Sequence, residues 1–319
     1  MSLTAAGPEE EKKNTQQSPP EWRVFRSSPF GKEPRYLTRK FWTMEVCFHC
    51  SYVLSQNMLF GNVGLFLCLD KRIENWPLVY SPVPVCWIIL CYLFIVWAGP
   101  KLMAKKEAVN LKLVLIAYNF TMVCLSAYMF YEFTVSSWMA NYSLLCQPVD
   151  YSNSPLALRM ASVCWLFYFS KYIEFCDTMF FILRKKNSQL TFLHVYHHST
   201  MILNCWLGLK YTPGGQSFMS GLVNSLIHVV MYFYYGLAAF GPSMTKYLWW
   251  KSYLTILQLL QFLVVTIHTV YNLFADCNYP DALNLIVFAY ALSLTALFCH
   301  FYYHSYLKSR TNDLRKCKV

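Results

Sequence analysis

Charged residues are scarce in this sequence. Only 13% of its 319 residues are Asp, Glu, Lys or Arg, whereas soluble domains carry about 25%. Hydrophobic residues make up 56% of the chain, and its mean hydropathy is +0.31. This balance excludes an ordinary soluble protein of this size and predicts an all-α polytopic membrane protein.

Long basic runs are also absent, although the formal net charge is +11. No nucleic-acid recognition motif accompanies that charge, so we expect no nucleic-acid partner. In a membrane protein, Lys and Arg gather on the cytoplasmic side of the spans instead. A secretory signal is not apparent, because the first apolar region begins only after Lys40. Most of the thirteen cysteines are expected to be small buried hydrophobes.

The chain divides into three parts. Residues 1–69 form an N-terminal arm that reads as disordered up to about Lys40 and then as a possible extra membrane segment. Residues 70–307 hold the seven-helix domain, and residues 308–319 are a basic cytoplasmic tail. The seven-helix domain contains seven apolar segments of about 20 residues or more, each long enough to cross a ~30 Å hydrocarbon core. They are 83–103, 113–135, 157–183, 190–209, 218–240, 247–274 and 282–306.

Basic residues in alternate loops predict how the chain lies in the membrane. The intervening loops are nearly free of positive charge. By the positive-inside rule, the basic loops and the C-terminus are cytoplasmic, and the other loops are lumenal. The basic loops contain Lys101, Lys105, Lys106, Lys112, Arg184, Lys185, Lys186, Lys246 and Lys251.

The lumenal loops carry two testable features. Asn141, Tyr142 and Ser143 form a glycosylation acceptor motif that would face the lumen. Cys146 and Cys277 lie in two different lumenal loops, where the oxidising side permits a disulfide between them. Two unpaired thiols are the alternative.

Three histidines share one face of the fourth segment. His194, His197 and His198 stand at i, i+3 and i+4, and the residues on both sides are apolar. Ionisable residues inside a membrane span are candidates for function. The cluster therefore indicates a metal site or a group of catalytic bases and nucleophiles, and core packing is the alternative.

Three other segments carry polar residues at helical spacing. Such stripes also arise from structural ion pairs, aromatic belts or hydrogen bonds between helices. The stripes are Lys171, Glu174, Asp177 and Thr178 in the third segment, Asn224, His228, Tyr232 and Tyr235 in the fifth, and Thr255, Gln258 and Gln261 in the sixth.

All four groups fall at a similar depth in the cytoplasmic half. The histidines begin about eight residues after the basic loop at 184–186, or roughly 12 Å at 1.5 Å per residue. Independent structural residues would have no reason to agree in depth, so we predict one buried polar chamber that opens to the cytoplasm. The basic residues at its mouth suit a phosphate-bearing substrate. These are Lys185, Lys186, Lys246 and Lys251.

The four stripes, taken in order, resemble the four motifs of the very-long-chain fatty acid elongases. The matching segments are 171–178, 194–198, 224–235 and 255–261, and the resemblance extends from about Asp70 to Tyr306. Four ordered motifs are specific, whereas the HxxHH motif alone is not. The N-terminal 69 residues look unlike the short N-terminus of the family.

The resemblance implies a 3-oxoacyl-CoA synthase of the endoplasmic reticulum membrane. Such an enzyme condenses a long-chain acyl-CoA with malonyl-CoA, without a bound cofactor or metal, and releases carbon dioxide and CoA. Its partners would be the lipid bilayer and the reductases and dehydratase of the elongation cycle, with a possible homo-oligomer. The expected fold has seven spans, six of them enclosing a tunnel closed at the lumenal side. It also implies a Cys146–Cys277 disulfide.

The same resemblance suggests roles for the site residues. His197 or His228 would attack the thioester and form an acyl-imidazole, and the other histidines would act as base or enolate stabiliser. Lys171, Glu174 and Asp177 would fix protonation and geometry. Asn224 and the two glutamines would donate hydrogen bonds, and Thr178, Tyr232 and Tyr235 would contact substrate. Gln189 and Leu193, just before the histidines, resemble members that act on polyunsaturated chains.

Two alternatives accompany this interpretation. A di-iron desaturase or hydroxylase also uses HxxHH, and His300 with His304 supplies an HxxxH, but about eight ligands are needed and the chain has eight histidines altogether. A lipid-binding or transport protein would explain the fold but not the cluster of His, Lys and carboxylates.

Overall fold

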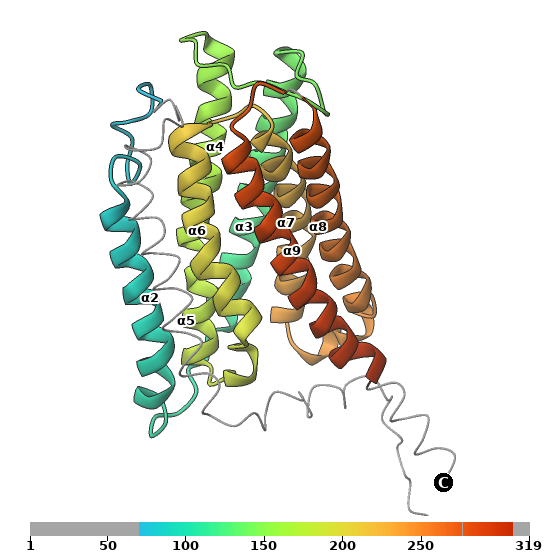
Figure 1. Cartoon of the computed structure of the whole chain (residues 1–319). Helices are drawn as coiled ribbons and strands as arrows, with labels where there is room; N and C mark the ends of the chain where they lie inside the picture. Colours follow the sequence, from blue (N-terminus) through green and yellow to red (C-terminus); the bar gives the residue numbers. More distant parts are fainter. Residues whose placement is uncertain (1–69, 276, 309–319) are drawn as a thin grey trace, which may run out of the picture.

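A computed structural model describes residues 70–275 and 277–308, and within these residues all the regular elements are helical (Figure 1). The predicted arm at 1–69 and the tail beyond residue 308 lie outside the described residues. Short turns η3 (Asn187–Gln189), η4 (Pro242–Tyr247) and η5 (Tyr303–Leu307) connect or extend the helices. The helices are α2 (Pro82–Leu102), α3 (Lys112–Met139), α4 (Pro155–Ile173), α5 (Phe175–Leu183), α6 (Phe192–Tyr211), α7 (Ser217–Ala239), α8 (Lys251–Phe274) and α9 (Asp281–Tyr302).

Five of the described helices are long and apolar enough to cross a membrane, so the chain is a polytopic membrane protein. They are α2, α3, α7, α8 and α9 with its η5 extension. Helices α4 and α6 are less apolar because α4 contains Arg159 and Lys171 and α6 contains the three histidines. Lys171 and the three histidines, which the sequence marks as functional, are thus among the residues that lower the hydropathy of their own helices.

Three of the helices around the polar site, α2, α4 and α6, have a side-chain cap at the N-terminus. The Ser81 and Ser154 hydroxyls accept hydrogen bonds from the first turns of α2 and α4, and Pro follows each serine. Thr191 caps α6 by accepting from the backbone nitrogen of His194 at 3.2 Å. This cap starts the helix at Phe192, two residues before His194, and so fixes where the histidine face begins.

The predicted segment 157–183 is wrong as a single helix, because the chain divides at Glu174 into α4 and α5. No proline or glycine marks this break. The Asp177 N–H donates to the Glu174 carbonyl at 3.1 Å, an i to i+3 bond that tightens and lengthens the turn. The other six predicted segments correspond to single helices.

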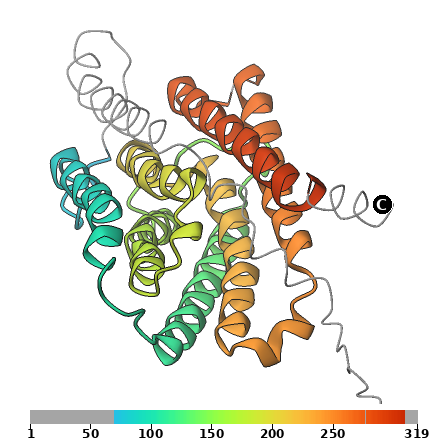
Figure 2. The same ribbon diagram turned by 90° about the horizontal axis from the view of Figure 1, so that it is seen from below.

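Six helices form a closed ring. Contacts run from α3 to α7, on to α8, α9, α6 and α4, and from α4 back to α3. Viewed along the bundle, α2 lies outside this ring, where it packs against α5 and α6 (Figure 2). A ring of this kind leaves an interior that side chains of all six helices can line.

The two ends of the bundle differ. At the upper end in Figure 1, the loop 140–154 and the link 275–280 are joined by the Cys146–Cys277 disulfide, with the Cα atoms 5.3 Å apart. We refer to this as the disulfide end. The opposite, basic end carries Lys101, Lys105, Lys106, Arg184, Lys185, Lys186, Lys246 and Lys251.

Gly221 sets how closely α7 approaches α3. A Cβ atom added at Gly221 would lie 2.5 Å from the Phe133 ring. We expect Gly221→Ala to lower the free energy of unfolding by about 1–3 kcal/mol, as overpacking does, measured by thermal unfolding in detergent. Gly208→Ala is the matched control, because nothing lies within 4 Å of its added Cβ. Equal melting temperatures for the two variants would contradict the close contact.

Candidate active site

A buried ion pair at the end of α4 has its other polar partners on α7. Lys171 Nζ lies 2.8 Å from Glu174 Oε1 and donates to Asn224 Oδ1 at 3.0 Å. His228 Nδ1 lies 3.3 Å from the same Glu174 oxygen. Lys171 and Glu174 are each only 2% exposed. An unpaired charge would be very costly at this depth, so the pairing is what allows both groups to be buried.

The second carboxylate of the third segment has a different partner on α7. Tyr232 OH donates to Asp177 Oδ2 at 2.9 Å, and the Tyr118 ring of α3 stands edge-on to Tyr232. Glu174 therefore faces His228, and Asp177 faces Tyr232, one turn further along. The four predicted polar residues Lys171, Glu174, Asp177 and Thr178 all contact side chains of other helices.

The break at Glu174 has a geometric reason. Helices α4 and α7 both run from the disulfide end to the basic end (Figure 1). From Glu174 to Asp177 is a step of three residues, whereas their partners His228 and Tyr232 are four residues apart. Three residues at about 2.0 Å, the rise of a tightened turn, span the same ~6 Å as four residues of α-helix at 1.5 Å. The tightened turn thus brings both carboxylates level with their partners.

Thr178 positions the histidine face rather than standing free. Its hydroxyl lies 2.8 Å from His194 Nε2 and 3.1 Å from Tyr92 OH of α2. The His194 and His198 ring centroids are 4.3 Å apart, and those of His197 and His198 are 5.3 Å apart. The three imidazoles therefore form one contiguous group, held at one end by Thr178.

The ring of helices encloses a cavity of about 150 Å³. His197, Asn224 and Gln261 are the predicted site residues that line it, and side chains of α3, α4, α6, α7, α8 and α9 complete the wall. At the disulfide end the lining reaches Thr212 and Gln216. From His197 to Thr212 the wall follows α6 for roughly 22 Å at 1.5 Å per residue.

Besides the basic residues, four predicted substrate contacts, Thr178, Tyr232, Tyr235 and Gln258, lie away from this cavity lining. Gln258 Nε2 donates to Met231 Sδ at 3.4 Å, so its amide is used in the contact between α7 and α8. Tyr235 is 41% exposed, with its ring edge-on to Tyr232. Thr255 pairs with Tyr306 OH at 3.3 Å. The stripe on α8 is thus divided: Gln261 lines the cavity, whereas Gln258 and Thr255 join helices.

The predicted basic residues all lie at one end of the bundle, but they are not equivalent. Lys185 donates to the carbonyls of Ala104 and Lys106 at 3.1 and 2.8 Å, which ties its loop to the loop after α2. Lys186 and Lys246 are exposed, and Lys251 begins α8. Lys185 therefore has a structural contact that the charge pattern did not reveal.

Several tyrosines that sequence reasoning missed complete the site. Tyr92 bonds Thr178, and Tyr290 OH of α9 lies 3.3 Å from the Thr200 hydroxyl and donates to the His197 carbonyl at 3.4 Å. Tyr196 pairs with Ser293 at 3.0 Å. None of these tyrosines stands in a polar stripe, so only the packing of neighbouring helices identifies them.

Within residues 70–275 and 277–308, no three His, Cys, Asp or Glu side chains are arranged to hold a metal ion. The His300 and His304 rings lie 4.4 Å apart where α9 passes into η5. His300 and His304, the HxxxH pair of the desaturase alternative, therefore contact each other within one helix end.

The fold and the site together define a membrane protein with a charged, histidine-rich centre inside a ring of helices. Residues 77–313 match the ELO family, described as GNS1/SUR4. The chain belongs to this family, that of the very long chain fatty acid elongases.

Similar curated proteins carry that name. The chain is 52% identical over 237 residues to very long chain fatty acid elongase 4 of Homo sapiens, covering 74% of this chain and 76% of the relative. It is 50% identical over 256 residues to elongase 7 of Rattus norvegicus (78% and 91%), and 48% identical over 245 residues to elongase 1 of Homo sapiens (76% and 88%). These matches agree with the resemblance drawn from the four motifs. None of the three relatives is named as a desaturase or a transport protein.

Removing one charge of the Lys171–Glu174 pair should cost more than removing both. Lys171→Met leaves a buried carboxylate without its ammonium, so we expect a loss of about 3–5 kcal/mol in the free energy of unfolding. The double variant Lys171→Met/Glu174→Gln should recover most of this loss. Chemical unfolding in detergent measures it, with exposed Lys186→Met as a control expected within about 0.5 kcal/mol of the parent. Additive losses in the double variant would contradict a buried ion pair.

Proposed function

We propose that this chain is the condensing enzyme of fatty acid elongation. It joins a long-chain acyl-CoA to the two-carbon unit of malonyl-CoA and gives a 3-oxoacyl-CoA, carbon dioxide and CoA. The observation that carries this proposal is His197, which stands where the buried ionic centre meets an enclosed, mostly apolar cavity. Family membership supports the same reaction.

The bundle fits seven membrane spans when α4 and α5 count as one. Six of them form the ring, and the cavity inside is the acyl tunnel, closed at the disulfide end. That end faces the lumen of the endoplasmic reticulum, where disulfides form. The basic end and the C-terminus face the cytoplasm, where Lys186, Lys246 and Lys251 attract the phosphates of CoA.

His197 is the nucleophile that the geometry favours, because it lines the cavity whereas His228 Nδ1 contacts Glu174. Its imidazole attacks the thioester carbon, the C–S bond breaks, and CoA leaves as the thiol with the proton that the imidazole gives up. Malonyl-CoA then loses carbon dioxide, and the freed electron pair forms an enolate. The enolate attacks the acyl-imidazole carbon, the C–N bond breaks, and the departing imidazolate takes up one proton from solvent, which restores neutral His197.

The surrounding residues assist these steps. Asn224 and Gln261 line the cavity and can donate hydrogen bonds to the developing oxyanions. Thr178 fixes the ring of His194, and Glu174 fixes His228. No bound metal or cofactor is needed for this sequence of steps. The 3-oxo product requires reduction and dehydration, so reductases and a dehydratase must act next.

Because Gln189 and Leu193 resemble the members that act on polyunsaturated chains, the proposal includes such chains as substrates. A homo-oligomer stays a prediction from the resemblance. Expression in an elongase-deficient cell, followed by profiling of acyl chains, tests both reaction and chain preference. We expect products longer by two carbons that depend on malonyl-CoA. Binding of acyl chains without any lengthened product would contradict the proposal.

The acyl-imidazole can be detected without malonyl-CoA. Intact mass after incubation with acyl-CoA alone should rise by one acyl group in the parent protein and in Asn141→Gln, whose exposed side chain lies in the loop 140–154 at the opposite end. His197→Ala should lose this adduct, because its nucleophile is gone. An adduct retained by both His197→Ala and His228→Ala would show that the acyl group is carried elsewhere.

Glycosylation tests the proposed orientation. Asn141 is exposed in the loop 140–154, so Asn141→Gln should remove a glycan that is visible as a shift in electrophoretic mobility. Asn119→Gln is the matched control, because Asn119 is 4% exposed inside α3 and its amide donates to the Leu115 carbonyl. A parent protein without any glycan on this loop, in cells that glycosylate a control protein, would contradict a lumenal disulfide end.

A further inference from the structure

The link between α6 and α7, residues 212–216, closes the cavity at the disulfide end. All of these residues are buried, although links between helices normally lie on the surface. Gly214 and Gly215 have φ values of +109° and +54°, a region that glycine enters freely. A Cβ at Gly214 would lie 2.9 Å from Met160 Cγ, and one at Gly215 2.7 Å from Val149 Cγ2. The link folds into the bundle because these two side chains are missing.

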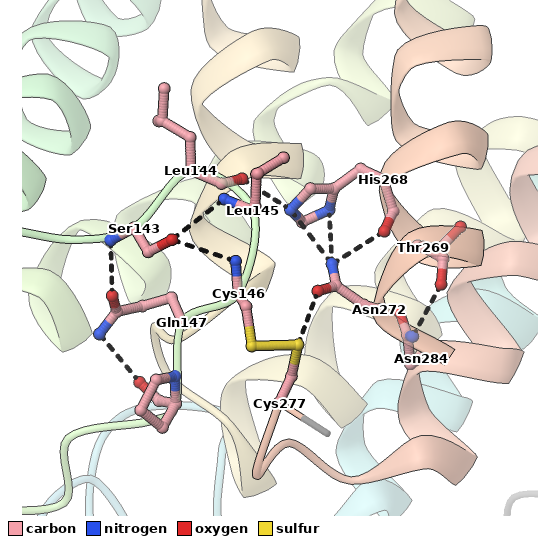
Figure 3. Close-up of a disulfide and its surroundings, with 11 residues drawn as sticks. Ser143, Leu144, Leu145, Cys146, Gln147, His268, Thr269, Asn272, Cys277 and Asn284 are labelled. Carbon is pink, nitrogen blue, oxygen red and sulfur yellow. Dashed lines mark hydrogen bonds between the residues drawn. A yellow bond between two sulfur atoms is a disulfide. The ribbon is translucent and has the colours of Figure 1, made fainter. Parts of the chain in front are cut away.

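The loop 140–154 covers this link from outside. Its Cys146 is bonded to Cys277, and the Leu144 carbonyl lies 3.1 Å from His268 Nε2 of α8 (Figure 3). Asn272, one turn further along α8, donates to the His268 carbonyl at 2.8 Å and so supports that contact. The loop that covers the closed end is therefore attached to α8 through His268 and to the link before α9 through the disulfide.

This end of the cavity is polar. Gln216 lines the cavity and is 4% exposed, yet neither its Nε2 nor its Oε1 has a hydrogen-bond partner among the described residues. The polar groups beside it are already satisfied. Thr212 Oγ1 donates to the Gly208 carbonyl and pairs with Tyr279 OH, both at 3.0 Å, and Ser217 Oγ donates to the Gly214 carbonyl at 2.6 Å. Of the described residues that line the cavity, Asn204, nearer to His197 on α6, has one side-chain atom without a hydrogen-bond partner, its Oδ1, and Gln216 has two.

A methyl-terminated acyl chain cannot satisfy this amide. A buried amide without partners is unfavourable, because it has lost its water and gained nothing in exchange. A hydroxyl group both donates and accepts, so it can meet the oxygen and the nitrogen of one amide. Sites with buried hydrogen-bonding groups discriminate strongly against ligands that lack the matching group.

We propose that Gln216 forms a subsite for a hydroxyl group on the terminal carbon of the acyl chain, so that ω-hydroxyacyl-CoA is a substrate class of this protein. This inference rests on the proposed function, because the acyl chain must enter the cavity from the histidine end. The hydroxyl would reach the amide only when the chain spans the roughly 22 Å from His197 to the link. The hydroxyl of a shorter chain would not reach Gln216 and would lie along the wall between His197 and the link, which includes the polar Asn204.

The test compares pairs of saturated substrates with equal numbers of heavy atoms, one ending in a hydroxyl and the other in a methyl group. For the purified full chain with malonyl-CoA, we measure kcat/KM over a ladder of chain lengths. We expect the ω-hydroxy member to be preferred about tenfold at lengths that reach the link. At lengths too short to reach the link, this tenfold preference should be absent.

Gln216→Leu should abolish the preference and retain turnover of methyl-terminated chains. If Gln216→Leu does not fold, Gln216→Met serves the same purpose, because it is unbranched and lacks the amide. Gln147→Leu is the matched control, since that amide lies outside the cavity lining and bonds Ser143 N at 2.7 Å and the Pro148 carbonyl at 3.3 Å. The control should keep the tenfold preference.

The outcomes separate the two proposals. Equal kcat/KM for both members of every pair would overturn the subsite and leave the condensing activity intact. A preference that survives both Gln216 variants would also overturn it. If no acyl-CoA is elongated, the proposed function fails, and equilibrium binding of the same pairs to the parent and to Gln216→Leu decides the subsite by the same tenfold criterion.

Discussion

The structure depends on the burial of one ion pair, Lys171 with Glu174, inside an apolar bundle. Taking both charges out of water costs several kcal/mol per ion before pairing, so the protein must supply partners in a fixed geometry. Those partners, Asn224 and His228, lie on α7. The need to satisfy the pair therefore holds α4 against α7, and the histidines of α6 complete the same centre. The catalytic proposal and the packing of the ring rest on the same few atoms.

Helix positions follow from the sequence because apolar length is a local property, and the four polar stripes could be found in the same way. The relative register of two helices is not local. That is why Glu174, with neither proline nor glycine beside it, gave no sign of a break. It is also why Gln258 was grouped with Gln261, although only Gln261 lines the cavity. Lys185 was predicted from charge alone, and its contacts with two backbone carbonyls depend on a loop distant in sequence.

Helix α2 shows how an element outside the ring takes part in the site. Tyr92 reaches Thr178, and the same hydroxyl meets His194, so a chain of three polar groups runs from α2 to the histidine face. Tyr92 also stacks on Phe175, with ring centroids 4.1 Å apart, where α5 begins. Because Tyr92 stands alone in an otherwise apolar helix, its contact with Thr178 could not be predicted from the sequence. Its contact adds a polar link to the apolar packing of α2, whose Val85 and Ile89 lie in one core cluster with residues of α6.

The tightened turn at Glu174 has a consequence for how the protein can vary. Glu174 and Asp177 are three residues apart, and their partners His228 and Tyr232 on α7 are four residues apart. Both contacts can therefore form together at only one relative position of the two helices. Sliding α4 past α7 by a single turn, about 5.4 Å, would move Glu174 and Asp177 past His228 and Tyr232 together. An insertion or deletion of one residue on either helix would do the same to everything beyond it. The number of residues from Glu174 to Asp177 and from His228 to Tyr232 is therefore fixed by these two contacts.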